Sequence, residues 1–411
     1  MRQRLHLSRL VVVRLRGRSM ALAVAIGLIT GVLFVVAPPA SAAANWSIMP
    51  SPRPPGNGSV GVDGVSCPST TNCYAVGSQS PPNGAIAAPA FIEHWNGHSW
   101  SIMSSPTGAA STFLSGVSCR STTSCFAVGV SQDQFAKTLV ERLSGKRWSI
   151  MSSPNPAGSA NSSLSGVSCR GTSCFAVGST RVSHWMTLVE HWAGNHWSIV
   201  TSPNPTGFQS ANLGGVSCPS TMSCFAVGLA QFRSSYEALM EHWNGHRWSI
   251  MPSPTLAGAN MRTVSCSTTA TCMAVGSYSV GGIDNTLVEA WNGHTWSVTP
   301  SPNPTGSIGT VLNGVSCPTS THCFAVGYSS YAVSQGPEPV GAAEKTLVEQ
   351  WNGHTWSIVR SRNPSPGGFK ETVLNGVSCH RKASCFAVGD FGGSPNQITG
   401  SGTTNLIERY R

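Results

Sequence analysis

Short stretches of alternating apolar and polar residues, each ending at a turn, recur along this chain. A typical unit reads GVSC, a short polar loop, CFAVG, then TLVEHW, a turn and HTWSI. Runs of this length that are rich in valine, phenylalanine and tryptophan predict β-strands when turn residues bound them. The turn before the last run is Asn-Gly in four units, a strong hairpin signal: Asn96-Gly97, Asn244-Gly245, Asn292-Gly293 and Asn352-Gly353. Each unit therefore predicts four short antiparallel strands.

The unit occurs seven times. Its most regular marker is a pair of cysteines five or six positions apart, and seven such pairs use all 14 cysteines. A run ending in glutamate and the phrase WSI or WSV also occur seven times each. Four strands per unit, at a period near 50 residues, predict a β-propeller. One such unit cannot bury its own faces, so stacking around a ring supplies the core.

The phrases are out of frame at the two ends of the repeat region. The first WSI precedes the first cysteine pair, and the last glutamate, Glu408, has no WSI after it. We therefore expect residues 45–51 to supply the outer strand of the last blade, which leaves the ring no open edge. The predicted fold class is all-β, a seven-bladed β-propeller of four-stranded antiparallel blades over residues 45–411. The blades are expected to begin near residues 59, 111, 161, 211, 260, 310 and 371.

The N-terminal segment differs from the repeats. Residues 1–18 contain six arginines and no acid, residues 20–37 form an apolar run, and Ala40-Ser41-Ala42 fits a small-residue cleavage site. This pattern predicts a signal peptide over residues 1–42 and therefore a secreted, extracellular protein. The alternative is an uncleaved anchor, because the apolar run lies at the lower limit for a membrane span.

The basic charge of the whole chain comes largely from this leader. The net charge of +10 falls to +4 without it, since 19 basic and 15 acidic side chains remain. That excess is too small to indicate a nucleic-acid partner. We expect no cofactor, membrane contact only if the leader stays uncleaved, and a monomer.

The cysteine pairs predict disulfides if the protein is exported. Repetition favours local pairing, which would close the hairpin between the first two strands of each blade. The expected bonds are Cys67–Cys73, Cys119–Cys125, Cys169–Cys174, Cys218–Cys224, Cys266–Cys272, Cys317–Cys323 and Cys379–Cys385. The alternative is zinc, but each hairpin offers only half of a four-ligand site.

A glutamate ends the third predicted strand of every blade. These residues are Glu93, Glu141, Glu190, Glu241, Glu289, Glu349 and Glu408. Seven equivalent copies spread around a ring do not form one active site. We expect each to accept hydrogen bonds at a blade-to-blade contact, from a tryptophan indole or from neighbouring backbone.

Ligand-binding residues are expected on the face that carries the loops between second and third strands, because these loops vary in length over a rigid scaffold. From second cysteine to repeat glutamate, the intervals are longest in blades six, seven and one, which are neighbours in a closed ring. Their loops contain Tyr328, Tyr331, Glu344 and Asp390, and the connector into blade seven adds Lys370 and Glu371. The hypothesis is a one-sided lip over the channel mouth, and the alternative is a set of tolerated insertions.

The central channel can be predicted from a second rule. Four positions before the first cysteine of each blade the residue type changes from copy to copy: Asp63, Ser115, Ser165, Gly214, Arg262, Asn313 and Asn375. One acid, one base and two amides could hold a small polar ligand or ordered water. The candidate ligand-binding residues are therefore Asp63, Arg262, Asn313, Asn375, Tyr328, Tyr331, Lys370 and Asp390, and no catalytic or metal-binding residue is assigned.

The repeat resembles kelch and sialidase-type Asp-box propellers. The Asp-box motif has a Gly-x-Thr-Trp second half, which Gly293-His294-Thr295-Trp296 and Gly353-His354-Thr355-Trp356 match, whereas Trp291 and Trp351 stand at the Asp position. The full phrase is similar to that of secreted repeat proteins of high-GC actinobacteria. The resemblance implies fold and export. We expect a non-catalytic scaffold that binds a glycan, a cell-envelope polymer or a protein. The alternative is an extracellular glycosidase-like hydrolase or lyase with its site at the channel mouth.

Overall fold

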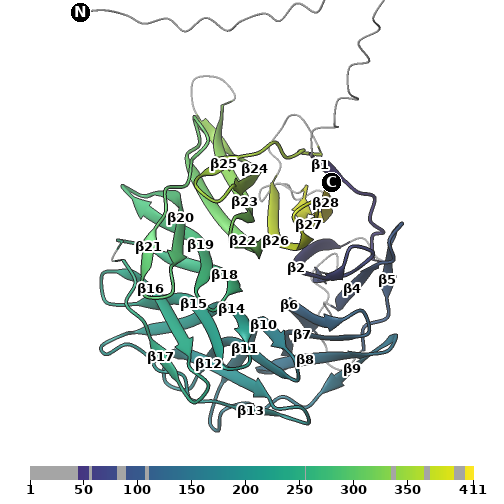
Figure 1. The fold of residues 1–411 in the computed structure, drawn as a ribbon, viewed down its shortest axis with the longest axis vertical. Coiled ribbons are helices and arrows are strands. Elements are labelled where there is room, and N and C mark those ends of the chain that lie inside the picture. Colours follow the sequence, from purple (N-terminus) through teal and green to yellow (C-terminus); the bar gives the residue numbers. More distant parts are fainter. Residues whose placement is uncertain are drawn as a thin grey trace, which may run out of the picture. The chain divides into compact units, whose positions relative to one another are not determined.

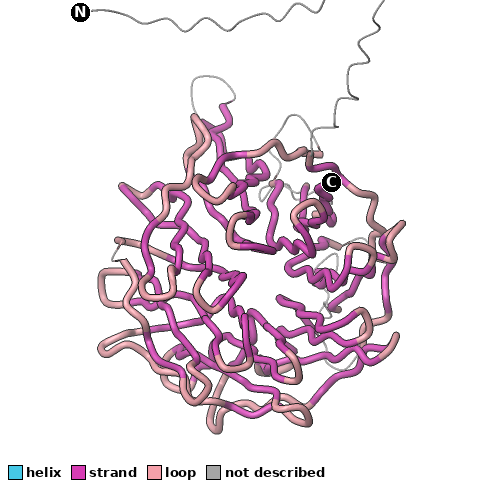
Figure 2. Tube along the Cα trace, in the orientation of Figure 1, coloured by secondary structure: helices cyan, strands magenta, loops and turns pink. Residues whose placement is uncertain are grey.

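The computed structural model describes residues 45–54, 58–80, 89–106, 111–254, 256–334, 339–364, 371–392 and 403–411. Residues 44–411 form one compact unit. The predicted signal peptide or anchor at 1–42 lies outside the described residues. Within the described ranges, this unit consists of strands, turns and loops (Figure 2). None of its described elements is a helix long and apolar enough to cross a membrane.

Seven four-stranded sheets make up the unit, one per blade. The first strands are β2 (Ser59–Ser69), β6 (Ser111–Ser121), β10 (Asn161–Arg170), β14 (Ser210–Ser220), β18 (Asn260–Thr268), β22 (Gly309–Thr319) and β26 (Thr372–Arg381). The second strands are β3 (Asn72–Ser80), β7 (Ser124–Gln132), β11 (Ser173–Arg181), β15 (Ser223–Gln231), β19 (Thr271–Val280), β23 (His322–Ser334) and β27 (Ser384–Phe391). Figure 1 shows the first strands nearest the centre of the ring.

The other two strands of each blade continue outward. The third strands are β4 (Ala90–Trp95), β8 (Ala136–Ser144), β12 (Trp185–Trp192), β16 (Tyr236–Trp243), β20 (Ile283–Trp291), β24 (Pro339–Trp351) and β28 (Thr404–Tyr410). The outer strands are β5 (Trp100–Met103), β9 (Arg147–Met151), β13 (Trp197–Ile199), β17 (Trp248–Ile250), β21 (Trp296–Val298), β25 (Trp356–Ile358) and β1 (Trp46–Ile48). All pairs are antiparallel, so the predicted seven-bladed propeller is confirmed.

The N-terminal strand closes the ring. β1 pairs with β28, with Trp46 opposite Tyr410 and Ile48 opposite Glu408, in a sheet of order β1-β28-β27-β26. The outer strand of blade seven therefore comes from the start of the repeat region and its other three strands from the end (Figure 1). Closure pairs an edge that would otherwise be open to other chains.

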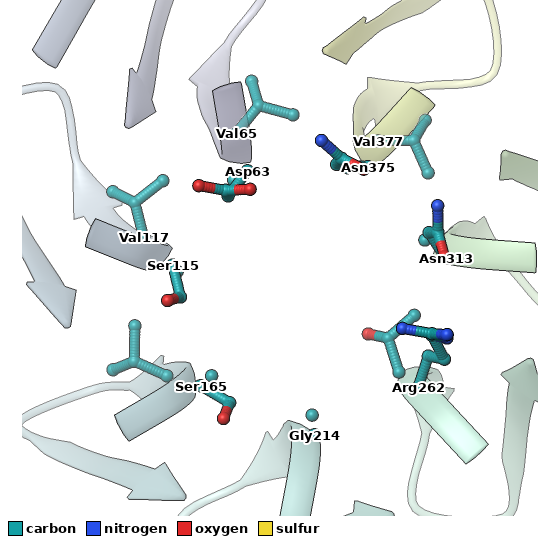
Figure 3. A pocket seen from close by; sticks show the side chains of 18 of the residues that line it. Asp63, Val65, Ser115, Val117, Ser165, Gly214, Arg262, Asn313, Asn375 and Val377 are labelled. Atoms are coloured by element: carbon teal, nitrogen blue, oxygen red, sulfur yellow. The ribbon is translucent and has the colours of Figure 1, made fainter. Parts of the chain in front are cut away.

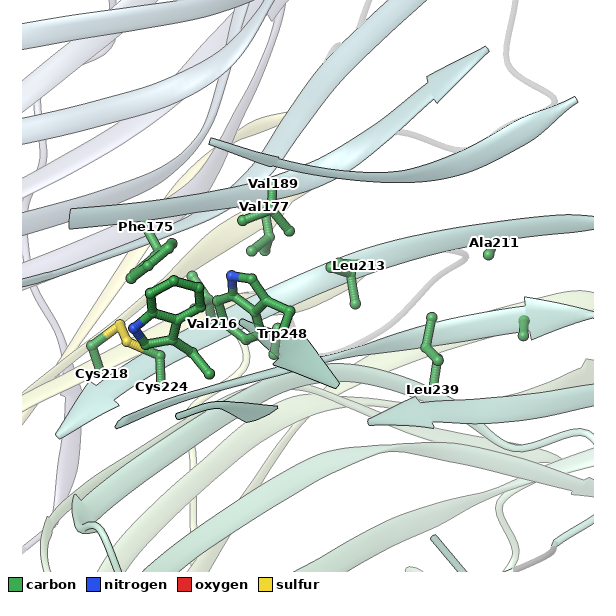
Figure 4. Packing of buried hydrophobic residues seen from close by; sticks show 13 residues of the cluster. Phe175, Val177, Val189, Ala211, Leu213, Val216, Cys218, Cys224, Leu239 and Trp248 are labelled. Carbon is green, nitrogen blue, oxygen red and sulfur yellow. A yellow bond between two sulfur atoms is a disulfide. The ribbon is translucent and has the colours of Figure 1, made fainter. Parts of the chain in front are cut away.

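The core is a series of clusters between neighbouring blades. Between blades three and four, Phe175 and Val177 pack against Leu213, Val216 and Trp248, among others (Figure 4). The WSI tryptophans are buried in this way in every blade, with exposed fractions from 2% to 6%. Each blade thus buries its faces only against its neighbours, as expected of a repeat architecture.

A closed ring of hydrogen bonds joins the inner strands. In each blade the serine before the first cysteine accepts a hydrogen bond from the backbone N–H of the next blade's first cysteine, at 2.9–3.0 Å. Ser66 accepts from Cys119, for example, and Ser378 of blade seven accepts from Cys67 of blade one. This explains why serine recurs in the phrase GVSC, which sequence inspection alone did not.

The repeated glutamates are also blade-to-blade acceptors. The predicted indole donor was wrong, whereas the other predicted donor, neighbouring backbone, contributes at Glu408, which accepts from Arg362. A connector serine of the preceding blade donates to each glutamate. Ser153 donates to Glu190 at 2.8 and 3.0 Å, and Ser202 to Glu241 at 2.9 Å. The indole N–H of every WSI tryptophan lacks a hydrogen-bond partner within the described structure. The glutamates therefore anchor the connectors of neighbouring blades.

All fourteen cysteines form local disulfides, as predicted. Each bond joins the first and second strands of one blade, and no free cysteine occurs. Within the described residues, no group of three or more histidine, cysteine, aspartate or glutamate side chains could hold a metal ion. Seven disulfides are typical of proteins that mature in an oxidising environment.

Removal of one disulfide gives a direct measure of this bond's contribution. Replacing Cys169 and Cys174 together by alanine is expected to lower the free energy of unfolding by about 2 kcal/mol, because the bond closes a short loop in the unfolded chain. Chemical denaturation of the two proteins measures the difference. A thiol assay on the unfolded, unreduced protein should find no free cysteine, and reactive thiols there would contradict the pairing.

Candidate functional site

The seven residues predicted to line the channel share one structural feature. Each is the extra residue of a β-bulge on its first strand. In blade one, Val62 pairs with Gly77 and Gly64 with Val76, which leaves Asp63 without a partner on β3. The same shift occurs in the other six blades. A bulge turns the unpaired side chain away from the sheet, and here it turns it into the channel (Figure 3).

The residue after the bulge is glycine in six blades because neighbouring inner strands approach closely there. A Cβ added to Gly64 would lie 3.0 Å from the carbonyl oxygen of Ser115 in the next blade. At the ring closure, a Cβ on Gly376 would lie 2.9 Å from the carbonyl oxygen of Asp63. Blade five has Thr263 at this position. The narrow spacing holds the seven bulge residues around one common space.

That space is a cavity of about 190 Å³ at the centre of the ring. All seven bulge residues line it, with the residues that follow them in sequence. In Figure 3, Asp63 and Arg262 lie on opposite sides, with Asn313 and Asn375 along the wall between them. Gly214 contributes no side chain, so blade four leaves its part of the wall open.

The side-chain amides of Asn313 and Asn375 form hydrogen bonds within the protein. The charged groups of Asp63 and Arg262 differ from them in this respect. The side-chain amide of Asn313 donates to the carbonyl oxygen of Leu374 at 3.0 Å. That of Asn375 donates to the carbonyl oxygen of Val62 and to Asp390 Oδ1, both at 3.1 Å. Among the described residues, neither Asp63 nor Arg262 has a hydrogen-bonding or ion-pair partner for its charged group. These two groups are therefore the ones available to a ligand.

Further carboxyl groups gather beside Asp63. Burial, and then the charge of Asp390, raise the pKa of Asp63 to about 7. Burial and the charge of Glu371 raise the pKa of Asp390 to about 6 against the hydrogen bond from Asn375, which lowers it. Burial, Glu371 and Asp390 raise the pKa of Glu344 to about 7. Blades six, seven and one thus place their acids within electrostatic reach of one another.

Tyr328 belongs to the same group of side chains. Burial and the charge of Glu344 raise the pKa of its phenol, and the charge of Arg262 opposes them. The side chains of the long loops and those of the channel therefore share one electrostatic environment. Glu344 and Glu371 were named among the loop residues but not among the predicted ligand-binding residues, because nothing in the sequence indicated that they lie near Asp390.

Two other predicted ligand-binding residues, Tyr331 and Lys370, do not belong to this group. Tyr331 lies on the long β23–β24 hairpin, where the Lys345 ammonium sits 4.5 Å from the centre of its ring. It does not line the central cavity. Lys370 lies outside the described residues. None of the long-loop residues lines the cavity, but Asp390 interacts electrostatically with Asp63, and Tyr328 with Arg262. Glu344 and Glu371 interact in turn with Asp390.

No protein-family model and no curated protein sequence matches this chain. Among solved structures, the chain is similar to YCF48 bound to D1 peptide, with 11% identity, a TM-score of 0.50 and coverage of 89% of this chain and 96% of the other. It is also similar to the GH74 xyloglucanase from Xanthomonas campestris, with 10% identity, a TM-score of 0.50 and coverage of 88% of this chain and 55% of the other. At such identities these likenesses concern the fold alone.

Proposed function

We propose that this protein is a secreted, non-catalytic propeller that binds a glycan, a cell-envelope polymer or a protein on the face of its second-to-third-strand loops. One observation carries the proposal. The bulge residues differ in type from blade to blade around one cavity, and the acids of blades six, seven and one gather beside them. Export is supported by the seven disulfides and by the sequence of residues 1–42.

The contrast between the repeat framework and the channel supports a binding role. The serine ring and the buried glutamates are the same in every blade, as a scaffold requires. Asp63 and Arg262 break that uniformity and point their charges into the cavity without a partner among the described residues. Rigid scaffolds with a few oriented polar groups are typical of ligand sites. The partial match to kelch and Asp-box turns supports the same scaffold role.

The two similar structures illustrate what this fold accommodates. One of those proteins has a bound peptide and the other is a xyloglucanase. Peptide and polysaccharide partners are therefore both reasonable subjects for a binding screen. The fold does not choose between them, because function depends on the site and not on the scaffold.

A glycosidase-like hydrolase or lyase is the second candidate, and one observation favours it. Asp63 and Asp390, with pKa values raised to about 7 and about 6, are two neighbouring carboxyl groups that exchange protons near neutral pH. Such a pair can provide a general acid and a general base. This second candidate places its chemistry in the same cavity as the binding site.

A screen with soluble polysaccharides and peptides tests the two candidates. For a binder, Arg262→Ala and Asp390→Asn are expected to weaken binding of the best ligand at least about tenfold, because each removes an oriented charge. Thr71→Ala, in the exposed cysteine loop on the opposite face, is the matched control and should bind as wild type. No binding to any probe would contradict the proposal. Product formation that Asp63→Asn abolishes would replace it with the hydrolase or lyase.

A further inference from the structure

Trp185 differs from every other tryptophan of the chain. Twelve of the 13 tryptophans occupy repeat positions, and their exposed fractions range from 1% to 9%. Trp185 lies outside the repeated phrases and is 37% exposed. It begins β12, opposite Arg181, at the hairpin between the second and third strands of blade three. A large apolar ring is therefore exposed on the variable-loop face, and packing in the repeat core does not account for it.

The indole borders a hollow between blades three and four. The hollow has a volume of about 220 Å³ and is lined by Ser179 and Trp185 of blade three and by Ser210, Ala211, Asn212 and Leu229 of blade four. No charged side chain lines it. Its lining therefore combines one indole, small apolar groups, two hydroxyls and one amide.

Two of these polar groups remain available to a ligand. Ser210 donates to Gln231 Oε1 at 2.8 Å and is already engaged. The hydroxyl of Ser179 and the exposed amide of Asn212 have no hydrogen-bond partner within the described part of the chain. A hydroxyl and an amide can each donate and accept, so they can pair with ligand hydroxyl groups in either sense.

This combination fits a sugar ring. A pyranose has an apolar face of C–H groups, which stacks on an indole, and a rim of hydroxyl groups, which pairs with uncharged hydrogen-bonding side chains. An ionic ligand would find no opposite charge among the lining residues. We infer that the hollow binds one sugar ring of a neutral glycan, stacked on Trp185 and hydrogen-bonded to Ser179 and Asn212. The inference rests on the proposed binding function and names its ligand class.

The position of the hollow relates it to the channel. Asn212 and Gly214 lie on the same strand, β14, about 7 Å apart along the chain. Gly214 is the bulge residue that leaves its part of the channel wall without a side chain. The glycan subsite is therefore beside the channel mouth, on the side where blade four is open, and separate from the carboxyl groups of blades six, seven and one.

Titration calorimetry of the disulfide-bonded protein with cello-, xylo-, manno- and chito-oligosaccharides tests this subsite. Trp185→Ala is expected to weaken binding of the best neutral oligosaccharide at least about tenfold, as for an aromatic anchor. Trp185→Phe should retain binding within a few-fold, and Asn212→Ala should weaken it several-fold. Tyr236→Ala is the matched control. Tyr236 occupies the same hairpin position in blade four, opposite Gln231, is 46% exposed and does not line the hollow.

The outcomes separate this inference from the broader proposal. If a neutral oligosaccharide binds and Trp185→Ala leaves its affinity unchanged while Arg262→Ala weakens it, the subsite is wrong and the binding function stands. Binding restricted to peptides or charged polymers would also overturn the sugar subsite alone. If no probe binds, both fail. Thermal denaturation of each variant identifies any loss of affinity that comes from unfolding, and Trp185→Phe then provides the decisive comparison.

Discussion

Replacing Trp46 by alanine is expected to lower the free energy of unfolding by about 3–5 kcal/mol, as for other buried aromatic side chains. Trp46 is only 2% exposed although its strand, β1, has three residues. Its ring centre lies 5.2 Å from that of Phe324 in blade six and 5.5 Å from that of Tyr410 in blade seven. The substitution therefore removes packing at the closure of the ring. Chemical denaturation followed by circular dichroism measures the effect.

Ser47→Ala is the matched control for ring closure. Ser47 is the next residue of the same strand, and its exposed hydroxyl donates only a long hydrogen bond of 3.3 Å to the carbonyl oxygen of Arg409. Its replacement should change the free energy of unfolding by less than about 0.5 kcal/mol. If Trp46→Ala were as mild as Ser47→Ala, β1 would not be part of the folded ring in solution.

Stability is expected to rise as the pH is lowered from 8 to 6.5. Burial raises the pKa of each of the seven repeat glutamates from 4.5 to about 7, and to about 8 for Glu241. The folded protein therefore binds protons more tightly than the unfolded chain. The stabilisation that comes from this tighter proton binding is fully present below pH 4.5, and it is lost as the pH rises through about 7. Over the window from 8 to 6.5 each glutamate contributes about 1 kcal/mol.

Half-buried histidines change the free energy of unfolding in the opposite direction, and their effect is largest below pH 6.5. Burial lowers the pKa of His94, His191 and His242, so that the unfolded chain binds more protons than the folded protein below pH 6.5. Measurements between pH 6.5 and 8 therefore report chiefly on the carboxyl groups. Asp63 and Glu344, whose pKa values are also raised, add to the trend with the same sign.

A triple variant assigns the pH dependence to the glutamates. Glu141→Gln, Glu190→Gln and Glu289→Gln together keep an acceptor for their connector serines but cannot ionise, so the pH dependence over this window should fall by about 3 kcal/mol. Glu237→Gln, at an exposed position, should leave it unchanged. Free energies of unfolding at several pH values provide the measurement. A stability that increases from pH 6.5 to 8 in the wild type would contradict the protonated state of these residues.

The channel residues could be predicted from one position, four residues before each first cysteine, because the same local structure recurs in every blade. A bulge four positions before each first cysteine has the same effect in all seven blades, so one position in the sequence predicts a whole ring of side chains. The gathering of acids could not be predicted in this way. Asp63 and Asp390 belong to opposite ends of the chain and meet only because β1 and β28 close the ring. Their proximity is a property of the closed ring and not of any one repeat.

The sequence by itself determined the strands, the blade number, the disulfide pairing and the closure by residues 46–48. These features depend on short-range residue patterns and on the number of repeated motifs, and both can be read directly from the sequence. The tertiary structure decided which group donates to each buried glutamate, why glycine follows the bulge, and which tryptophan remains exposed beside a hollow. Those outcomes depend on the spacing and angle between neighbouring blades, because groups meet across that interface from positions such as 37 or 53 residues apart.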